Sequence, residues 1–333
     1  MKKRVYASIL LVVTLSGAVQ SHAQETRSPI IDMHMHHNPW GPPDENEQPS
    51  DWRQAWEEAK PLMDEANVVL GLVSGSVEVA QEWQRLAPDQ IIAGIIFPCD
   101  GGILANSGGR KCFKNGEVWP DVDWLRQEIE EKRIGFLGEI TTQYLGLPPN
   151  DPKMDPYYAL AEELDIPVLI HIGMGLPGAA YSSLDVEDVW CGEQPCAPNF
   201  RAAMSRPMLL EEILIRHPRL RICVMHAGWP MQNEMINLLY NHPQVYVDVA
   251  FLMYKDVIPR RAFHGYLQAL VEHGFGKRIV WGIDGDHSDA PEVIEAIESA
   301  EFLTSEQEAD IFYNNAARFL QLTEEQMSAH FNR

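Results

Sequence analysis

The stretch Ile30-Ile31-Asp32-Met33-His34-Met35-His36 determines how the rest of the chain is interpreted. In an extended strand, successive side chains alternate between two faces, so Asp32, His34 and His36 share one face and the apolar side chains share the other. The two imidazoles stand about 7 Å apart along the backbone, which lets them converge on one cation. The stretch predicts a buried strand with two metal ligands at its tip. A loop histidine cluster without a ligand role is the alternative.

Strand-like and helix-like segments alternate from this stretch to near the end of the chain. We expect seven further strands, at residues 68–73, 91–97, 134–140, 167–172, 220–226, 245–251 and 278–283. We expect helices at residues 51–66, 77–86, 122–132, 157–164, 200–216, 230–240, 260–273, 291–300 and 305–320. Such alternation is typical of a parallel sheet, and eight units favour a closed α/β barrel, the (β/α)8 TIM barrel, over an open doubly wound sheet. The expected fold is one barrel domain with a C-terminal helical extension.

Ligand-type residues stand at the ends of several expected strands. In a (β/α)8 barrel the chemistry lies at the C-terminal ends of the strands. Taken singly, each has a structural explanation, such as a capping or backbone hydrogen bond. Their convergence on one rim instead predicts a metal site. The set comprises His34 and His36 on the first strand, Glu139 on the fourth, His171 on the fifth, His226 on the sixth and Asp284 on the eighth.

Two other carboxylates lie on the inner faces of the expected strands. Asp32 is one step deeper than His34, and we interpret it as a buried hydrogen-bonding residue rather than a ligand. Asp248 alternates with valines on the seventh strand, and we interpret it as a supporting residue of the site.

The first 23 residues have the pattern of a secretory signal peptide. Lys2-Lys3-Arg4 precede an apolar run from Val5 to Val19, and Ser21-His22-Ala23 follow it. The run is shorter than the roughly 20 residues that span a bilayer, which disfavours a membrane anchor. We therefore expect cleavage after Ala23, a mature domain over residues 24–333 and a periplasmic or secreted protein. No later segment is apolar enough to span a membrane.

The five cysteines of an expected exported chain call for disulfide pairing. Cys99 and Cys112 bracket a Gly-rich stretch, and Cys191 and Cys196 bracket a short turn. We predict disulfides Cys99–Cys112 and Cys191–Cys196, with free thiols as the alternative. Cys223 lies in an apolar run and is expected to be a buried free thiol.

The formal net charge of −22 disfavours nucleic acid as a partner. A small-molecule substrate is the expected partner, and a homo-oligomer is left open.

The order His-x-His, Glu, His, His and Asp at successive strand ends resembles the amidohydrolase superfamily of metal-dependent (β/α)8 barrels. The runs His-Ala-Gly-Trp-Pro at 226–230 and Trp-Gly-Ile-Asp-Gly-Asp at 281–286 support this likeness. More narrowly, the chain is similar to the amidohydrolase-related branch, which includes aminocarboxymuconate-semialdehyde decarboxylase and 2-pyrone-type lactone hydrolases. The likeness covers residues 29 to 321.

The resemblance implies that His34, His36, His171 and Asp284 bind a divalent ion, expected to be zinc, with His226 beside it. In a one-ion site His226 acts on substrate or water; in a two-ion site it becomes a ligand. Many binuclear relatives bridge two ions through a carboxylated lysine on strand four. The corresponding run here contains no lysine, although Glu139 could bridge instead. One ion is therefore favoured over two.

The resemblance also implies the chemistry. Zinc lowers the pKa of a bound water toward about 7, and Asp284 can take that proton as hydroxide attacks a carbonyl. The leading function is an exported hydrolase of a small amide, lactone or ester. The alternative is a metal-dependent non-oxidative decarboxylase (carboxy-lyase), which Trp229 disfavours because related decarboxylases often carry Glu at that position. A non-catalytic metal-binding or carbohydrate-binding barrel is the third interpretation.

Overall fold

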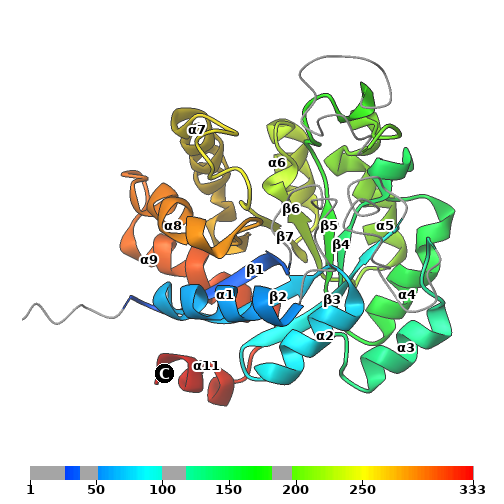
Figure 1. The fold of residues 1–333 in the computed structure, drawn as a ribbon. Coiled ribbons are helices and arrows are strands. Elements are labelled where there is room, and N and C mark those ends of the chain that lie inside the picture. Colours follow the sequence, from blue (N-terminus) through cyan, green and yellow to red (C-terminus); the bar gives the residue numbers. More distant parts are fainter. Residues whose placement is uncertain (1–26, 38–51, 100–117, 182–196, 333) are drawn as a thin grey trace, which may run out of the picture.

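The computed structural model describes residues 27–37, 52–99, 118–181 and 197–332. The described chain forms one eight-stranded parallel sheet whose strands lie in sequence order (Figure 1). The strands are β1 (Ile30–His36), β2 (Val68–Ser74), β3 (Ile91–Phe97), β4 (Phe136–Ile140), β5 (Val168–His171), β6 (Ile222–Met225), β7 (Val245–Asp248) and β8 (Ile279–Val280).

The sheet curls until its first and last strands meet. The Met33 amide donates to the Trp281 carbonyl at 3.0 Å, and the Asp284 amide donates to the His34 carbonyl at 2.8 Å. These bonds join β1 to the segment that continues β8. The expected (β/α)8 barrel is therefore confirmed.

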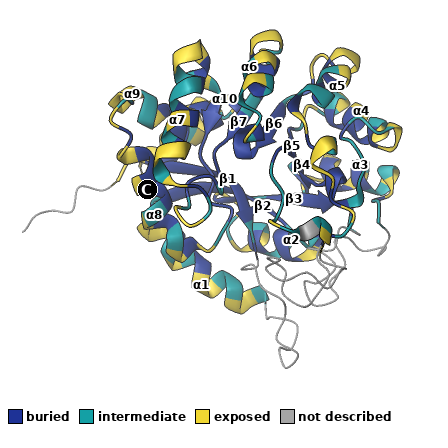
Figure 2. Cartoon of the chain, turned by 90° about the horizontal axis from the view of Figure 1, so that it is seen from above, coloured by how far each residue is buried: buried dark blue, intermediate teal, exposed yellow. Residues whose placement is uncertain are grey.

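Helices surround the barrel, and their inner faces are buried while their outer faces are exposed (Figure 2). Apolar residues of the strands, such as Val168, Ile170 and Val224, belong to the same core cluster as Leu160 and Leu238 of the helices. The helices are α1 (Trp52–Glu65), α2 (Val77–Leu86), α3 (Val122–Glu130), α4 (Asp155–Glu163), α5 (Glu211–Arg216), α6 (Gln232–Asn241), α7 (Arg260–Leu270), α8 (Ala290–Glu298), α9 (Ser305–Ala309), α10 (Asn315–Phe319) and α11 (Glu324–Phe331).

The structure differs from the expected helices in two places. The helix expected at 200–216 is two 3-10 turns followed by the short α5, because Pro207 cannot donate an intrahelical hydrogen bond. The helix expected at 305–320 is divided into α9 and α10 by a π-helical turn over Asp310–Asn314. The expected C-terminal helical extension continues beyond residue 320 in α11, which begins at a capping box formed by Thr323 and Gln326.

The cysteine predictions are tested in part. Cys223 is free and fully buried, as expected. Cys99 is disulfide-bonded. Cys112, Cys191 and Cys196 lie outside the described residues, so the two pairings stay predictions.

The expected signal peptide also lies outside the described residues. Across the ranges that are described, no helix is long and apolar enough to cross a membrane.

Candidate metal centre

The barrel brings all the expected ligand-type residues to one place at the C-terminal ends of its strands. His34 and His36 come from β1, Glu139 from β4 and His171 from β5, while His226 and Asp284 follow β6 and β8 directly. Five of the six are no more than 6% exposed, and His36 is half-buried. Two overlapping groups have donor atoms within 4.8 Å of one another: His34, His36 and Asp284, and His34, Glu139 and His226.

Two glycines allow the strands that carry the carboxylates to approach their neighbours. A Cβ on Gly282 would lie 2.6 Å from the Cβ of His34, so only glycine lets the end of β8 bring Asp284 beside β1. Gly138 has φ +157°, and a Cβ there would lie 2.7 Å from the Cβ of Leu169 on β5. Each glycine stands one or two residues before a site carboxylate, which explains the Gly-Ile-Asp and Gly-Glu runs.

The histidines are oriented by hydrogen bonds on the side away from the centre. His34 Nδ1 donates to Asp248 Oδ2 at 3.0 Å, and His226 Nδ1 donates to the Ala250 carbonyl at 3.1 Å. His171 Nε2 donates to the Met174 carbonyl at 2.5 Å. These partners select the tautomer of His34 and His226, so each of these two rings directs Nε2, with a lone pair, toward the shared centre. His171 Nδ1 faces Glu139 Oε1 at 2.5 Å.

The imidazole nitrogens that face the centre lie in two close pairs. When the rings are neutral, neither nitrogen of a pair carries a proton that it could donate to the other. His34 Nε2 is 3.2 Å from His36 Nε2, and His226 Nε2 is 3.2 Å from His171 Nδ1. Lone pairs that face each other at this distance require a proton or a cation between or beside them. The donor set therefore fits a divalent ion that accepts imidazole nitrogen and carboxylate oxygen.

Glu139 lies between the two histidine pairs and offers one oxygen to each. Its Oε2 is 3.5 Å from His36 Nε2 and 3.9 Å from His34 Nε2. Its Oε1 is 2.5 Å from His171 Nδ1 and 3.6 Å from His226 Nε2. One carboxylate thus connects two sets of nitrogen donors.

Asp284 completes the group on the β8 side. Its Oδ1 is 3.5 Å from His34 Nε2 and 3.4 Å from His36 Nε2. Asp284 and His226 have φ values of 46° and 55°, which non-glycine residues seldom adopt. The Asp284 backbone N–H donates a hydrogen bond to the His34 carbonyl, and the His226 backbone N–H donates one to Asp248 Oδ1. These hydrogen bonds hold the two conformations.

The charges of the site are strongly coupled. Burial alone would lower the pKa of His36, but hydrogen bonds with Asp284 and Glu139 outweigh it and raise that pKa to about 9. Burial would likewise lower the pKa of His34, yet the Asp284 and Asp248 carboxylates raise it well above its usual value. Burial favours neutral Glu139, but His171 holds the pKa of this carboxyl well below its usual range. The carboxylates therefore favour positive charge on the histidines, as they would favour a bound cation.

Asp32 and Asp248 support the centre, as their sequence positions indicated. Asp32 Oδ1 accepts from the amides of His34 and Ile283, at 3.0 and 3.1 Å, and so connects β1 to the end of β8. Burial raises the pKa of Asp32 to about 7.

Some residues that orient the site were not singled out from the sequence. The Ser74 hydroxyl lies 3.3 Å from His36 Nδ1, and the rings of Tyr144 and His171 are in edge contact at 5.3 Å. The carbonyls of Met174 and Ala250 act through the backbone, so no side-chain pattern could reveal them. The position of Ser74 at the end of β2 was the available signal.

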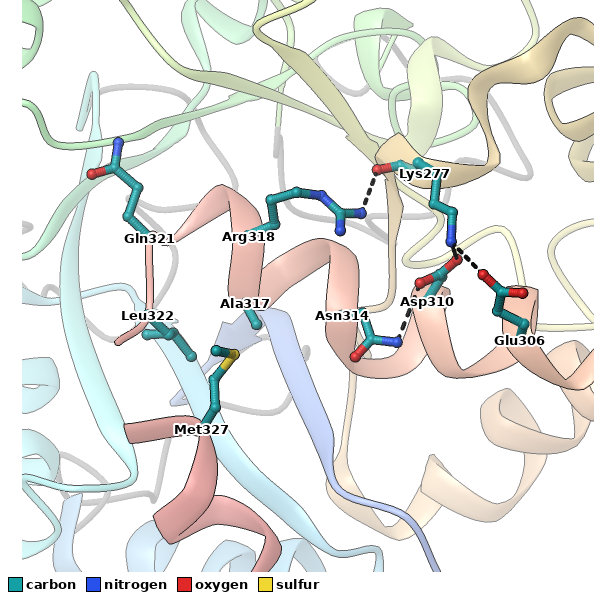
Figure 3. Close-up of a pocket in the computed structure, with 9 residues that line it drawn as sticks. All are labelled: Lys277, Glu306, Asp310, Asn314, Ala317, Arg318, Gln321, Leu322 and Met327. Carbon is teal, nitrogen blue, oxygen red and sulfur yellow. Dashed lines mark hydrogen bonds and ion pairs between the residues drawn. The ribbon is translucent and has the colours of Figure 1, made fainter. Parts of the chain in front are cut away.

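A second hollow lies away from this centre, beside the start of β8, and is lined by residues of α9, α10 and α11 (Figure 3). Its volume is about 550 Å³. Lys277 Nζ lies 2.8 Å from Glu306 Oε1 and 2.6 Å from Asp310 Oδ2. Lysine and carboxylate groups of the hollow therefore pair with one another. The hollow lies on the N-terminal side of the barrel, where residues contribute to stability rather than to chemistry.

The fold and the donor cluster together define a (β/α)8 barrel with a metal-type site on its C-terminal rim. Residues 113–322 match the family model described as amidohydrolase, and the chain belongs to this family. It is an enzyme of the metal-dependent amidohydrolase superfamily, as the strand-end motifs indicated. No curated protein matches the chain.

Solved structures share the fold at low sequence identity. A probable 2-pyrone-4,6-dicarboxylic acid hydrolase from Acinetobacter baumannii is 14% identical, with a TM-score of 0.57 over 88% of this chain and 99% of that one. A dihydroxybenzoic acid decarboxylase from Polaromonas with bound manganese is 13% identical, with a TM-score of 0.56 over 90% and 99%. An uncharacterized TIM-barrel protein from Bordetella bronchiseptica is 16% identical, with a TM-score of 0.58 over 92% and 100%.

Proposed function

We propose that this protein is a metal-dependent hydrolase of a small carbonyl substrate, an amide, a lactone or an ester. The observation that carries the proposal is Asp284. Its buried Oδ1 stands within 3.5 Å of two imidazole nitrogens. A carboxylate in this position can both hold an ion and exchange a proton with the reacting groups.

The ion is proposed to be zinc, held by His34, His36, His171 and Asp284, with Glu139 as a further ligand. A bound divalent ion would supply Lewis-acid chemistry, polarising a carbonyl and lowering the pKa of water toward about 7. One ion remains our proposal. Two ions would be the alternative, with Glu139 as a shared ligand, because each of its oxygens lies beside one histidine pair. Metal stoichiometry separates the two.

The chain itself performs the proton transfers. Asp284 accepts a proton from the attacking water and returns it to the leaving group. Burial would lower the pKa of His226, but Glu139 and Asp284 raise it above its usual value. A protonated His226 Nε2 donates to the carbonyl oxygen of the substrate as negative charge develops there. His226 therefore orients the substrate, and Asp284 moves the proton.

Decarboxylation is the second candidate, because structural neighbours include decarboxylases. A carboxylated substrate is commonly bound by arginine, which matches carboxylate geometry. Among the described residues, no lysine or arginine forms an ion pair with Glu139 or Asp284. The substrate panel below therefore includes a carboxylated aromatic compound, which tests this candidate directly.

The test is a substrate panel with two separate readouts. The metal-loaded protein is incubated with δ-valerolactone, phenyl acetate, acetanilide and 2,6-dihydroxybenzoate, and acid release and carbon dioxide release are measured in parallel. The proposal predicts hydrolysis of at least one neutral substrate and no carbon dioxide. Carbon dioxide release without hydrolysis would assign the site to the carboxy-lyase class.

We also propose that the protein is exported, on the strength of residues 1–23. The mature chain is expected to begin at Gln24. N-terminal sequencing of protein from the periplasmic or secreted fraction tests this, and retention of Met1 would contradict it.

A further inference from the structure

Three consecutive polar residues immediately beyond β4 have buried side chains with atoms that lack hydrogen-bond partners. Thr141, Thr142 and Gln143 are 4%, 0% and 1% exposed. Among the described residues, neither threonine Oγ1 has a hydrogen-bond partner, and neither does Gln143 Nε2. Buried polar groups are nearly always paired, and an unpaired one costs about 1–3 kcal/mol. Three such groups in a row call for a partner that the described part of the chain does not supply.

The segment is held firmly beside the metal centre. Thr141 follows Glu139 by two residues, and its amide donates to the Phe97 carbonyl at 3.0 Å. The carbonyls of Thr142 and Gln143 accept from the amides of Leu147 and Arg201, at 3.1 and 3.2 Å. The backbone is therefore satisfied while the side chains are not.

The next residue connects the segment to the site directly. The ring of Tyr144 is in edge contact with the His171 imidazole on one side, at 5.3 Å, and with Phe200 on the other, at 5.2 Å between centroids. Tyr144 and Phe200 form a small apolar cluster with Ala197. Polar side chains next to an apolar aromatic wall are the usual composition of a small-molecule site.

A buried glutamine elsewhere in the barrel shows what a structural role requires. Gln90 is 2% exposed, and its Nε2 donates to the Val68 carbonyl at 2.6 Å. That amide holds β2 in place. Gln143 Nε2 has no such bond, although the side chain is equally buried.

The chemistry of the segment selects the class of group it can bind. Two hydroxyls and an amide carry no charge, and they donate and accept hydrogen bonds in comparable measure. The segment contains no cationic group that could balance a substrate carboxylate, whereas its hydroxyls and amide can donate to and accept from a hydroxyl or carbonyl group.

We propose that the β4 rim segment, Thr141–Gln143, is the specificity-determining part of the substrate site and binds an uncharged hydroxyl or carbonyl group of the substrate. This inference rests on the proposed hydrolase function and names a property of its substrate. The segment acts by positioning the substrate and takes no part in proton transfer.

The test compares Gln143→Met and Thr142→Val, which keep the side-chain volume, with the control Gln90→Met. The full-length metal-loaded proteins are assayed with δ-valerolactone and with mevalonolactone, which has the same ring and a hydroxyl group. We expect the wild-type protein to prefer mevalonolactone in kcat/KM. Gln143→Met and Thr142→Val should each reduce this preference by about threefold to tenfold, the value of one neutral hydrogen bond.

Thermal unfolding supplies a readout that a merely structural role would change. Gln143→Met and Thr142→Val each remove an unpaired buried group, so Tm should stay unchanged or rise. Gln90→Met removes a paired amide and should lower Tm without changing the preference between lactones. A fall in Tm for Gln143→Met as large as that for Gln90→Met, or an unchanged preference, would overturn the inference.

Failure of the proposed function gives a different result. If the wild-type protein hydrolyses neither lactone, that function is contradicted, and calorimetric titration with mevalonolactone then decides the inference. Binding that Gln143→Met weakens by about threefold to tenfold would support the rim segment. Absent binding, or equal binding by both proteins, would overturn it.

Discussion

Asp248 and His34 form a buried pair in which Asp248 Oδ2 lies 3.0 Å from His34 Nδ1. The second oxygen of Asp248 accepts from the amides of His226 and Ala250, at 2.8 and 3.1 Å. One carboxylate thus fixes the ring of a proposed ligand and the backbone of a proposed catalytic residue. A group of this kind tunes a metal site without touching the ion.

Asp248→Asn should weaken metal binding by about 10- to 100-fold, the usual cost of losing such a supporting group. The asparagine side chain has one acceptor oxygen, so it cannot accept hydrogen bonds from His34 Nδ1 and from the backbone amides of His226 and Ala250 together. Competition with a chelator of known affinity measures the effect. Asp165→Asn, on the exposed carboxylate that pairs with Arg221, is the matched control. Equal metal affinity for the Asp248 variant and the control would exclude this role.

His34→Ala and His36→Ala should each abolish stoichiometric metal binding, because each removes a nitrogen that faces the cluster. Elemental analysis of the purified variants measures the metal per chain. His273→Ala, at an exposed position in the segment after α7, should keep the wild-type content. Full occupancy in either β1 variant would show that the pair is not a ligand pair.

The metal-free protein should lose stability as pH rises. Folding raises the pKa of His36 from 6.5 to about 9, so its stabilising contribution is present below pH 6.5 and disappears as pH rises through about 9. Folding lowers the pKa values of Glu139 and Asp284, so their effect on stability depends on pH in the opposite direction. Their stabilising contributions disappear as pH falls below the usual carboxylate range.

Thermal unfolding of the metal-free protein between pH 6 and pH 9.5 tests this dependence. We expect Tm to fall across that range and the fall to be much smaller once metal replaces the protons. A Tm of the metal-free protein that is flat or rising over the same range would contradict the assigned charges.

Cys99 should pair with Cys112, and Cys191 with Cys196, since each pair closes a short loop. A short loop closure contributes about 2–3 kcal/mol to stability. Peptide mapping without reduction identifies the bonds. Cys223 should be alkylated only after unfolding, because it is fully buried. Cys99 linked to a residue other than Cys112 would refute the pairing.

The barrel and the members of its site could be predicted because both depend on local patterns. Alternation along each strand determines which side chains face inward, and strand order places their ends on one rim. In the structure, Gly282 and Gly138 allow the close backbone approach that brings Asp284 and Glu139 to this rim.

The hydrogen-bond network could not be predicted to the same depth. The tautomer of His171 depends on the Met174 carbonyl, and that of His226 on the Ala250 carbonyl. Backbone groups leave no residue pattern. The unpaired side chains of Thr141–Gln143 were equally hidden, because pairing depends on three-dimensional neighbours that a single sequence does not show.

Asp284 is proposed both to hold the ion and to transfer the proton. The most direct test is Asp284→Asn, measured for metal content and for turnover of a hydrolysed substrate in the same preparation. Asparagine keeps an oxygen that reaches the ion but cannot accept the proton. Metal content should stay near the wild-type value while kcat falls by about 10²–10⁴-fold, the usual value of general base catalysis. Near-normal turnover with metal retained would contradict the proposed role of Asp284 in proton transfer.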